Sequence, residues 1–299
     1  MVTVFTNGRL VTRELLDALK SRGLCCGFQI SFDGTGGWHD WMRGIDGAAT
    51  YAEHAVTLCR EYGFPVSCAM CIHRHSIPVL RDTVNYLARL GVGSLKVEAA
   101  CPEGEWKKHP EHFLSPKELF QAFLEYIPQY FEDDCPLEIE LDAFFIYEGN
   151  ETAYRNGFQR DSWFTPANCL ICNSMKQNFY IGSDGSILPC MSMAGTPVAK
   201  HFYNIFETPL KEILDESNLT RAGDLKLQDM IDHNPECRAC AYTNVCRGGC
   251  RARAVGDHSD DLLLPESATC EFFRGEWPDK IRQRCDAAFE AYKHRRGIS

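Results

Sequence analysis

Eight of the sixteen cysteines in this 299-residue chain lie between positions 169 and 270, at spacings typical of metal ligands. Thiolates two or three residues apart can converge on one metal centre, as they do in zinc and iron–sulfur sites. A chain of this length does not need the disulfide framework that is typical of small secreted domains. The pattern therefore predicts a metal-binding region. Its members are Cys169, Cys172, Cys190, Cys237, Cys240, Cys246, Cys250 and Cys270.

The stretch 178–189 indicates how the first of these cysteines come together. Short apolar runs flank Ser183-Asp184-Gly185. An Asp-Gly pair between two such runs favours a β-hairpin, because both turn residues must accept positive φ. The hairpin would fold Cys190 back towards Cys169 and Cys172.

A structural zinc site is the simpler alternative, because an isolated CxxC pair is common in zinc proteins. Here eight candidate ligands form two interleaved sets, which is more than one zinc ribbon needs. Arg247-Gly248-Gly249 lies between two of the ligands and suits a backbone that turns closely around a cluster. The residues favour iron–sulfur clusters and leave a zinc-stabilised scaffold open.

Charge and hydropathy argue against several classes of protein. The formal net charge is -10, whereas a nucleic-acid-binding surface is normally basic. No apolar run approaches the length that crosses a membrane. Residues 1–5 lack the basic segment and long apolar core of a signal peptide. We therefore expect a cytoplasmic protein with no nucleic-acid partner and no membrane partner.

The first hundred residues alternate between strand-like and helix-like segments. Such alternation predicts an α/β fold, with a parallel sheet and helices packed outside it. A Ser115–Glu118 capping box opens a further helix, 136–147 is strand-like, and 278–295 is an amphipathic helix. The expected strands are 2–6, 27–32, 65–72 and 94–99, and the expected helices are 12–22, 48–62 and 77–90.

These patterns predict four parts of the chain. Residues 1–105 form half of a (β/α) barrel or a short open sheet, and 106–165 are a helix and connecting segment that completes or links it. Residues 166–275 form the cysteine-rich domain with its short hairpin and helices. Residues 276–299 are a C-terminal helix.

The order of the cysteines adds a more specific resemblance. Cys172-x12-Gly185-x4-Cys190, then Cys237-x2-Cys240-x5-Cys246-x3-Cys250, then Cys270 resembles the signature of the SPASM domain in radical S-adenosylmethionine (SAM) enzymes. Cys169 matches the additional ligand of members with two clusters. The resemblance implies two auxiliary 4Fe–4S clusters. One would be held by Cys169, Cys172, Cys190 and Cys250, and the other by Cys237, Cys240, Cys246 and Cys270.

The N-terminal half is similar to the later strands of a radical SAM barrel, from the third strand onward. Thr6-Asn7-Gly8 resembles a TNG turn, Ser31-Phe32-Asp33-Gly34 an SxDG motif, and the segment 39–44 an HDxxRG motif. The resemblance implies that Ser31 and Arg43 contact SAM, and that Asp33, Thr6 and Asn7 belong to the same binding site. Taken singly, the motif residues are also compatible with an ordinary turn and a solvated arginine.

The motif that defines radical SAM enzymes, CxxxCxxC, does not occur in the chain, and neither does the glycine-rich GGEP segment. The resemblance therefore implies a fragment of an enzyme whose complete form also carries SAM and a third 4Fe–4S cluster. We expect the fragment because a sheet that starts at its third strand would leave an unpaired edge. The alternative is a genuine short protein without radical chemistry.

The resemblance also implies an activity. Relatives with a SPASM domain often modify peptides or proteins through a 5′-deoxyadenosyl radical, with flavodoxin or ferredoxin as the reductant. A peptide or protein maturase is therefore the leading expectation, although this chain alone lacks the cysteines that start the radical. An electron-transfer or peptide-binding module with no catalysis is the alternative. The sequence identifies no catalytic residue. Weaker candidates are His73, His75 and Glu98, and Trp38, Trp41 and Trp106 are either peptide contacts or packing residues.

Overall fold

The computed structural model describes residues 2–24, 26–100, 104–142, 144–150, 153–156, 166–215, 218–256 and 260–298. The end of the predicted connecting segment, 157–165, lies outside this range. The chain forms two compact units. The first joins Met1–Gly157 to Asp279–Ser299, and the second is Phe158–Pro278.

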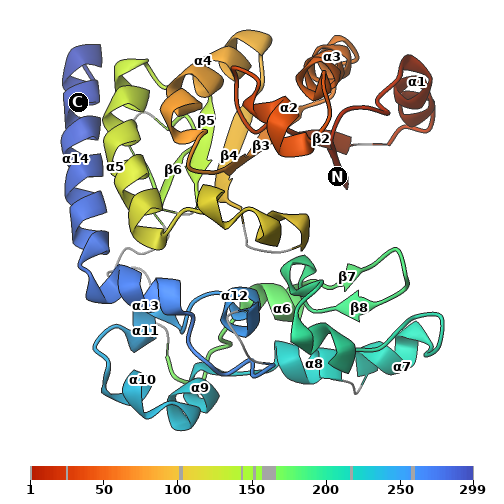
Figure 1. Ribbon diagram of the computed structural model, residues 1–299, viewed down its shortest axis with the longest axis vertical. Coiled ribbons are helices and arrows are strands. Elements are labelled where there is room, and N and C mark those ends of the chain that lie inside the picture. The colour runs from red at the N-terminus through yellow and green to blue at the C-terminus, as the bar shows by residue number, and fades with distance from the viewer. Residues whose placement is uncertain are drawn as a thin grey trace. The chain divides into compact units, whose positions relative to one another are not determined.

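The first unit is built on one sheet with the strand order β1-β2-β3-β4-β5-β6. The first five strands run parallel, and β6 is antiparallel to β5. Figure 1 shows helices between successive strands, which confirms the predicted α/β fold. The strands are β1 (Val2–Thr6), β2 (Cys26–Ser31), β3 (Val66–Ile72), β4 (Ser94–Ala99), β5 (Glu138–Leu141) and β6 (Phe145–Tyr147), and the helices are α1 (Arg13–Ser21), α2 (Trp38–Arg43), α3 (Ala48–Glu61), α4 (Leu80–Leu90) and α5 (Pro116–Glu132).

The central strand β3 shows why this sequence packs as a covered sheet. Its residues alternate between fully buried and half-buried, and Cys68, Met70 and Ile72 are on the buried face. A strand whose side chains alternate in this way places one face against packed helices. Burial raises the pKa of Cys68 to about 12, so this thiol behaves as a small apolar group.

The segment 136–147 differs from the single strand-like run expected from its sequence. It forms β5 and β6, an antiparallel pair in which Ile139 lies opposite Tyr147. The chain turns at Asp142, which has φ +42°. Apolar residues continue on both sides of Asp142 without glycine or proline, so this one aspartate was the only local sign of a turn in the run.

The C-terminal helix α14 (Trp277–Arg296) packs on α5. The Phe131 ring lies 5.5 Å from the Phe289 ring and 5.4 Å from the Tyr292 ring, measured between centroids. Arg284 Nε donates a hydrogen bond to the Leu124 carbonyl at 3.2 Å. Figure 1 shows the two helices side by side. Aromatic packing therefore makes this distant segment part of the first unit.

The predicted capping box at the start of α5 is present. The Glu118 amide donates to Ser115 Oγ at 3.3 Å, and the Ser115 amide donates to Glu118 Oε2 at 2.8 Å. The Ser115 amide and hydroxyl, together with Arg74, lower the pKa of Glu118 to about 2. The carboxylate is therefore ionised in the folded protein at every pH where the protein is normally studied.

Replacing Ser115 by alanine should lower the free energy of unfolding by about 1 kcal/mol at pH 7, because the first turn of α5 loses its acceptor. Because folding lowers the pKa of Glu118, its carboxylate contributes stability that is complete above about pH 5 and is lost as the pH falls towards 2. Urea unfolding followed by tryptophan fluorescence measures the loss at pH 7. Ser21→Ala, at an exposed position in α1 that caps no helix start, is the matched control. Equal midpoints for the two variants would contradict the role of the cap.

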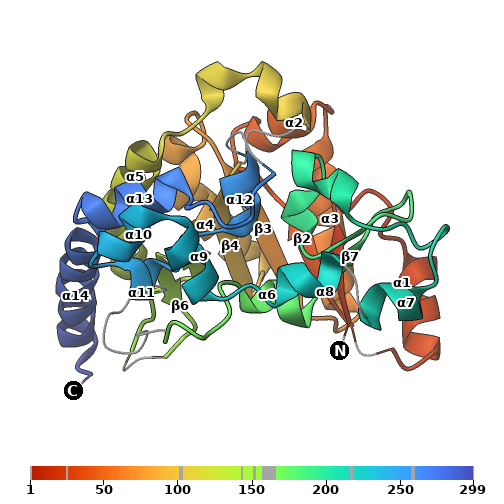
Figure 2. The same cartoon turned by 90° about the horizontal axis from the view of Figure 1, so that it is seen from below.

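The second unit consists of short helices and loops around one hairpin, as Figures 1 and 2 show. The predicted hairpin is β7 (Tyr180–Ile181) with β8 (Ile187–Leu188), and Gly185 has φ +80°. None of the described helices in either unit is long and apolar enough to cross a membrane. The helices of this unit are α6 (Asn173–Gln177), α7 (Leu210–Asp215), α8 (Asn218–Gly223), α9 (Leu227–His233), α10 (Pro235–Ala239), α11 (Thr243–Cys246), α12 (Arg251–Gly256) and α13 (Ser267–Arg274).

Candidate iron–sulfur centre

Four of the predicted ligand cysteines lie close enough for the charge of one to affect the pKa of another. Three short helices position them. Cys237 lies in α10, and Cys240 directly follows that helix. Cys246 is the last residue of α11, and Cys270 lies in α13. Burial, and then the negative charges of the other three cysteines, raise the pKa of Cys246 to about 11, although a hydrogen bond from the Gly248 amide opposes them. Such a gathering of thiolates is costly without a cation at its centre and is typical of a metal site.

Two members of the other predicted set lie against one small core. Cys172 and Cys190 both pack on this core, and α12, which follows Cys250, contributes Ala252 and Val255 to it. The Cys169 carbonyl accepts a hydrogen bond from the Leu227 amide at 2.9 Å, which anchors the start of the segment. Cys172 and Cys190, which lie before and after the hairpin, thus share one core.

The spacing of the sulfur atoms bears on the kind of centre. Across the part of the chain that the structure describes, no three cysteine sulfurs lie within 4.8 Å of one another. A tetrahedral zinc ion with Zn–S bonds of about 2.3 Å would hold its sulfurs about 4 Å apart. A cube of four irons and four sulfides needs a wider frame of thiolates. The described cysteine sulfurs are therefore not gathered as three ligands of one zinc ion.

The loop between Cys246 and Cys250 turns through three successive residues with positive φ, namely Arg247, Gly248 and Gly249, at +48°, +73° and +78°. A Cβ on Gly249 would lie 2.4 Å from Glu266 Oε2 and 2.5 Å from Thr269 Oγ1. The same Glu266 oxygen accepts a hydrogen bond from the Cys250 amide at 2.7 Å. Glycine is therefore required here both for its conformation and for lack of space.

Arg251 is a charged residue of this site that sequence reasoning missed. Its side chain is 1% exposed and lies among backbone carbonyls. Nη1 donates to Leu262 O at 2.9 Å and to Leu264 O at 2.6 Å. Nη2 donates to Gly249 O at 3.1 Å and also bonds to Gly248 O. A lone arginine in a motif gives no sign in the sequence that it is buried.

The charge of Arg251 faces both predicted sets of cysteines. Burial lowers the pKa of its guanidinium, and the negative charges of Cys250, Glu266, Cys172 and Cys246 oppose that effect. Cys172 and Cys250 belong to one predicted set and Cys246 to the other. A buried cation needs compensating negative charge, and thiolates that carry a cluster would supply it.

In the first unit, the residues expected to contact SAM lie at the carboxyl ends of neighbouring strands. Ser31 is the last residue of β2, and Thr6 ends β1, where it lies opposite Ile30. The Thr6 hydroxyl accepts a hydrogen bond from the Gly8 amide, and the Asn7 side chain accepts one from the Arg9 amide, each at 3.1 Å. In the structure, Thr6 and Asn7 therefore shape the turn after β1.

Asp33 is fully buried and holds Arg43. Arg43 Nε donates to Asp33 Oδ2 at 2.7 Å, and the Cys71 amide donates to Asp33 Oδ1 at 3.0 Å. Although burial opposes it, the His39 contact, the Arg43 charge and the Cys71 amide lower the pKa of the Asp33 carboxyl. The Arg43 side chain is 31% exposed, so one side of its guanidinium still reaches the surface. The structure brings Asp33 and Arg43 together directly.

Residues 172–241 match the family model of the SPASM iron–sulfur cluster-binding domain. This stretch of the chain is similar to a SPASM domain. The match begins at Cys172 and ends just after Cys240, so it includes the hairpin and the start of the second group of cysteines. It confirms an iron–sulfur domain.

Two curated proteins are similar along most of the chain. One is the Fe-coproporphyrin III synthase of Methanosarcina barkeri, 26% identical in an alignment of 272 residues that covers 84% of this chain and 64% of that protein. The other is the PqqA peptide cyclase of Ruegeria pomeroyi, 25% identical over 254 residues, which are 84% of this chain and 62% of that protein. The chain thus spans less than two thirds of the length of either relative.

Solved structures share the fold. The protein anSMEcpe, solved with bound AdoMet and the Kp18Cys peptide, superposes with a TM-score of 0.64 at 20% identity, over 95% of this chain and 75% of that one. Streptococcus suis SuiB, solved with bound SAM, superposes with a TM-score of 0.61 at 16% identity, over 89% of this chain and 59% of that one. These similarities show that the chain shares its fold with the two proteins.

Proposed function

We propose that the chain is part of a radical SAM enzyme that modifies a peptide or protein, with two auxiliary 4Fe–4S clusters in its second unit. The match of residues 172–241 to the SPASM domain carries this proposal. When bound beside its own cluster, SAM supplies a 5′-deoxyadenosyl radical, which removes hydrogen from the substrate. The protein's part is to bind, to orient and to exclude water.

The proposed ligands of the first cluster are Cys169, Cys172, Cys190 and Cys250, and those of the second are Cys237, Cys240, Cys246 and Cys270. The mutual electrostatic effects among Cys237, Cys240, Cys246 and Cys270 support the second set. The common core behind Cys172 and Cys190 supports the first. In this assignment Cys250 lies between Cys246 and Cys270 of the second set in sequence but serves the first cluster.

For SAM, we propose that Arg43 binds the carboxylate of the amino-acid part and that Ser31 contacts the cofactor. A guanidinium fork is the group best suited to a carboxylate. The buried Asp33 accepts from Nε and so fixes the orientation of the fork. Asp33 would thus position Arg43 instead of contacting SAM itself. Thr6 and Asn7 would shape the edge of the same site through the turn after β1.

A peptide substrate is the proposal that the relatives support best. One curated relative is named as a cyclase of the PqqA peptide, and SuiB has been solved bound to the precursor peptide SuiA. Met191 follows Cys190, where a sulfatase-activating branch has aspartate, which disfavours that particular substrate. The name of the archaeal relative, Fe-coproporphyrin III synthase, makes a porphyrin the second candidate. A flavodoxin or ferredoxin is the proposed reductant.

Turnover of SAM tests the catalytic proposal. The 299 residues contain no CxxxCxxC, so we expect this chain alone to form no 5′-deoxyadenosine from SAM and dithionite. A longer product of the same reading frame that includes a CxxxCxxC should form it, and Arg43→Gln in that product should weaken SAM binding. Cleavage of SAM by the 299 residues alone would contradict the proposal.

The non-catalytic alternative predicts a different result. An electron-transfer or peptide-binding module would contain about eight irons per chain. It would form no 5′-deoxyadenosine, whatever segment precedes it. A zinc scaffold would contain zinc and lack the brown colour of iron–sulfur proteins. Iron and zinc analysis of anaerobically purified protein separates these two outcomes.

A further inference from the structure

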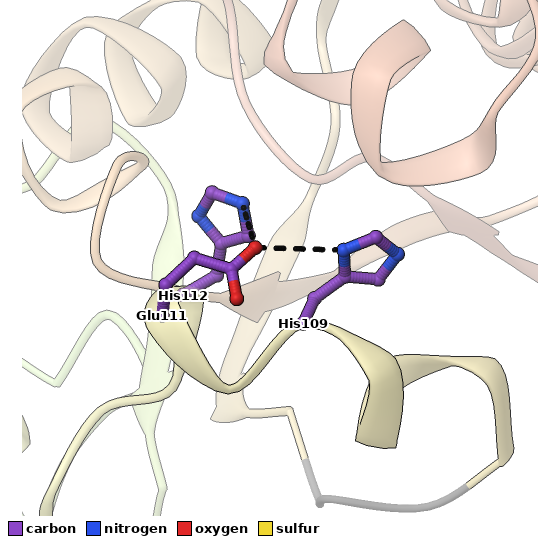
Figure 3. Close-up of side chains that lie close together, drawn as sticks. All are labelled: His109, Glu111 and His112. Carbon is purple, nitrogen blue, oxygen red and sulfur yellow. Dashed lines mark ion pairs between the residues drawn. The ribbon is translucent and has the colours of Figure 1, made fainter.

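Three potential metal ligands meet on the loop between β4 and α5, far along the sequence from the SPASM cysteines. They are His109, Glu111 and His112, and their ligand atoms all lie within 4.8 Å of one another. Figure 3 shows the Glu111 carboxylate between the two imidazole rings. Glu111 Oε1 is 3.2 Å from His112 Nε2 and 3.6 Å from His109 Nδ1.

These separations are close to those of ligands around one ion. Zinc binds imidazole nitrogen at about 2.0–2.1 Å and carboxylate oxygen at a similar distance, which separates tetrahedral ligands by about 3.3 Å. The ligand atoms of Glu111 and both histidines therefore need to move little to share an ion. The backbone amide of Glu111, and then the two histidines, lower the pKa of its carboxyl, so the carboxylate is available as a ligand.

The backbone holds this loop in place. Pro110 is at the first position of the 3-10 helix Pro110–His112, where its ring restricts φ. The Arg74 amide donates to the His112 carbonyl at 3.2 Å, and Arg74 Nη1 donates to the Glu111 carbonyl at 2.9 Å. The loop after β3 thus anchors the ligand loop. Ligands that are ordered beforehand lose less entropy when they bind an ion.

Further imidazoles surround the three ligands. The His75 ring lies 4.7 Å from the His112 ring between centroids, and the His73 ring lies 6.3 Å from that of His75. His73 is 1% exposed, and within the described part of the chain neither of its ring nitrogens has a hydrogen-bond partner. A buried polar group without a partner is costly and marks a position that calls for a functional explanation.

We propose that His109, Glu111 and His112 bind a divalent transition-metal ion of the zinc type, with His75 or water at the fourth position. Nitrogen and carboxylate ligands without sulfur suit zinc and its neighbours in the first transition row. With His75 as the fourth ligand, the ion would tie the loop before α5 to the loop after β3. It would be separate from the iron of the SPASM clusters in ligand type and in position along the chain. The proposal does not depend on the proposed function.

Zinc binding by the full chain tests this site. The protein is prepared without a histidine tag, its iron–sulfur clusters are assembled anaerobically, and zinc is then added and counted per chain. X-ray absorption at the zinc edge measures the bond lengths. We expect one zinc with neighbours at about 2.0–2.1 Å, whereas cysteine sulfur would give about 2.3 Å. We expect His109→Ala and His112→Ala each to lose this one zinc ion per chain.

Two further variants control for folding. Glu111→Gln keeps the size of an exposed side chain and should weaken zinc binding while leaving the circular dichroism spectrum unchanged. His233→Ala removes an exposed histidine that pairs with Asp261 in the second unit and should keep the zinc. Zinc bound only through sulfur would overturn the proposal. So would a nitrogen-bound zinc that remains in His112→Ala.

Discussion

Cys240→Ser should halve the iron content of the protein, from about eight to about four irons per chain, because a 4Fe–4S cluster needs four thiolates. Cys172→Ser should give the same iron count by removing the other cluster. The two losses differ in which cluster remains, and electron paramagnetic resonance of the reduced proteins distinguishes them. We expect the spectrum of each variant to contain one of two components present in the parent protein.

The strongest test of the ligand assignment uses neighbouring cysteines. Cys250→Ser should resemble Cys172→Ser, and Cys246→Ser should resemble Cys240→Ser, although Cys246 and Cys250 are close in sequence. Cys285→Ala is the control, because burial raises the pKa of this thiol to about 12 and it packs in the C-terminal helix. If Cys246→Ser and Cys250→Ser lost the same cluster, the interleaved assignment would be wrong. Full iron content in Cys240→Ser would contradict a cluster at that position.

Arg251→Met should lower the free energy of unfolding of the second unit by about 3–5 kcal/mol, the usual result of removing one partner from a buried charged network. The change leaves the carbonyls of Gly249, Leu262 and Leu264 without the Arg251 donors, whereas the Gly248 carbonyl keeps the Glu266 amide at 2.8 Å. It also removes the positive charge that faces Cys172, Cys246 and Cys250. Both losses act in the same direction. Loss of the visible absorbance of the clusters in increasing denaturant measures this effect.

Two other variants make the Arg251 prediction specific. Arg251→Lys keeps the charge but cannot reach all four carbonyls, because an ammonium lacks the planar fork of guanidinium, so an intermediate loss is expected. Arg238→Met removes an arginine that lies between two ligand cysteines but is 61% exposed, and its effect should be within about 0.5 kcal/mol. If Arg251→Met and Arg238→Met lowered the free energy of unfolding equally, burial of Arg251 would contribute nothing to the stability of the second unit.

Local patterns in the sequence predicted most of the secondary structure of the first unit. The capping box at Ser115, the strand before Gly8 and the Asp184-Gly185 turn each depend on neighbouring residues, so each could be recognised in the chain itself. The prediction failed between 136 and 147, where the turn at Asp142 lies inside an apolar run. There the backbone reverses at a single aspartate, whose preference for turns is a weak signal inside an apolar run.

The sequence by itself determined the metal-binding character of the second unit, because the thiolates of one centre recur at short and regular spacings. It also indicated the motif that contains Asp33 and Arg43. Only the tertiary structure decided that Asp33 is buried beneath Arg43, that Arg251 is surrounded by carbonyls, and that His75 faces His112. These contacts join segments that are separate in the chain. Burial and the meeting of distant side chains arise from packing, so a spacing pattern alone cannot show them.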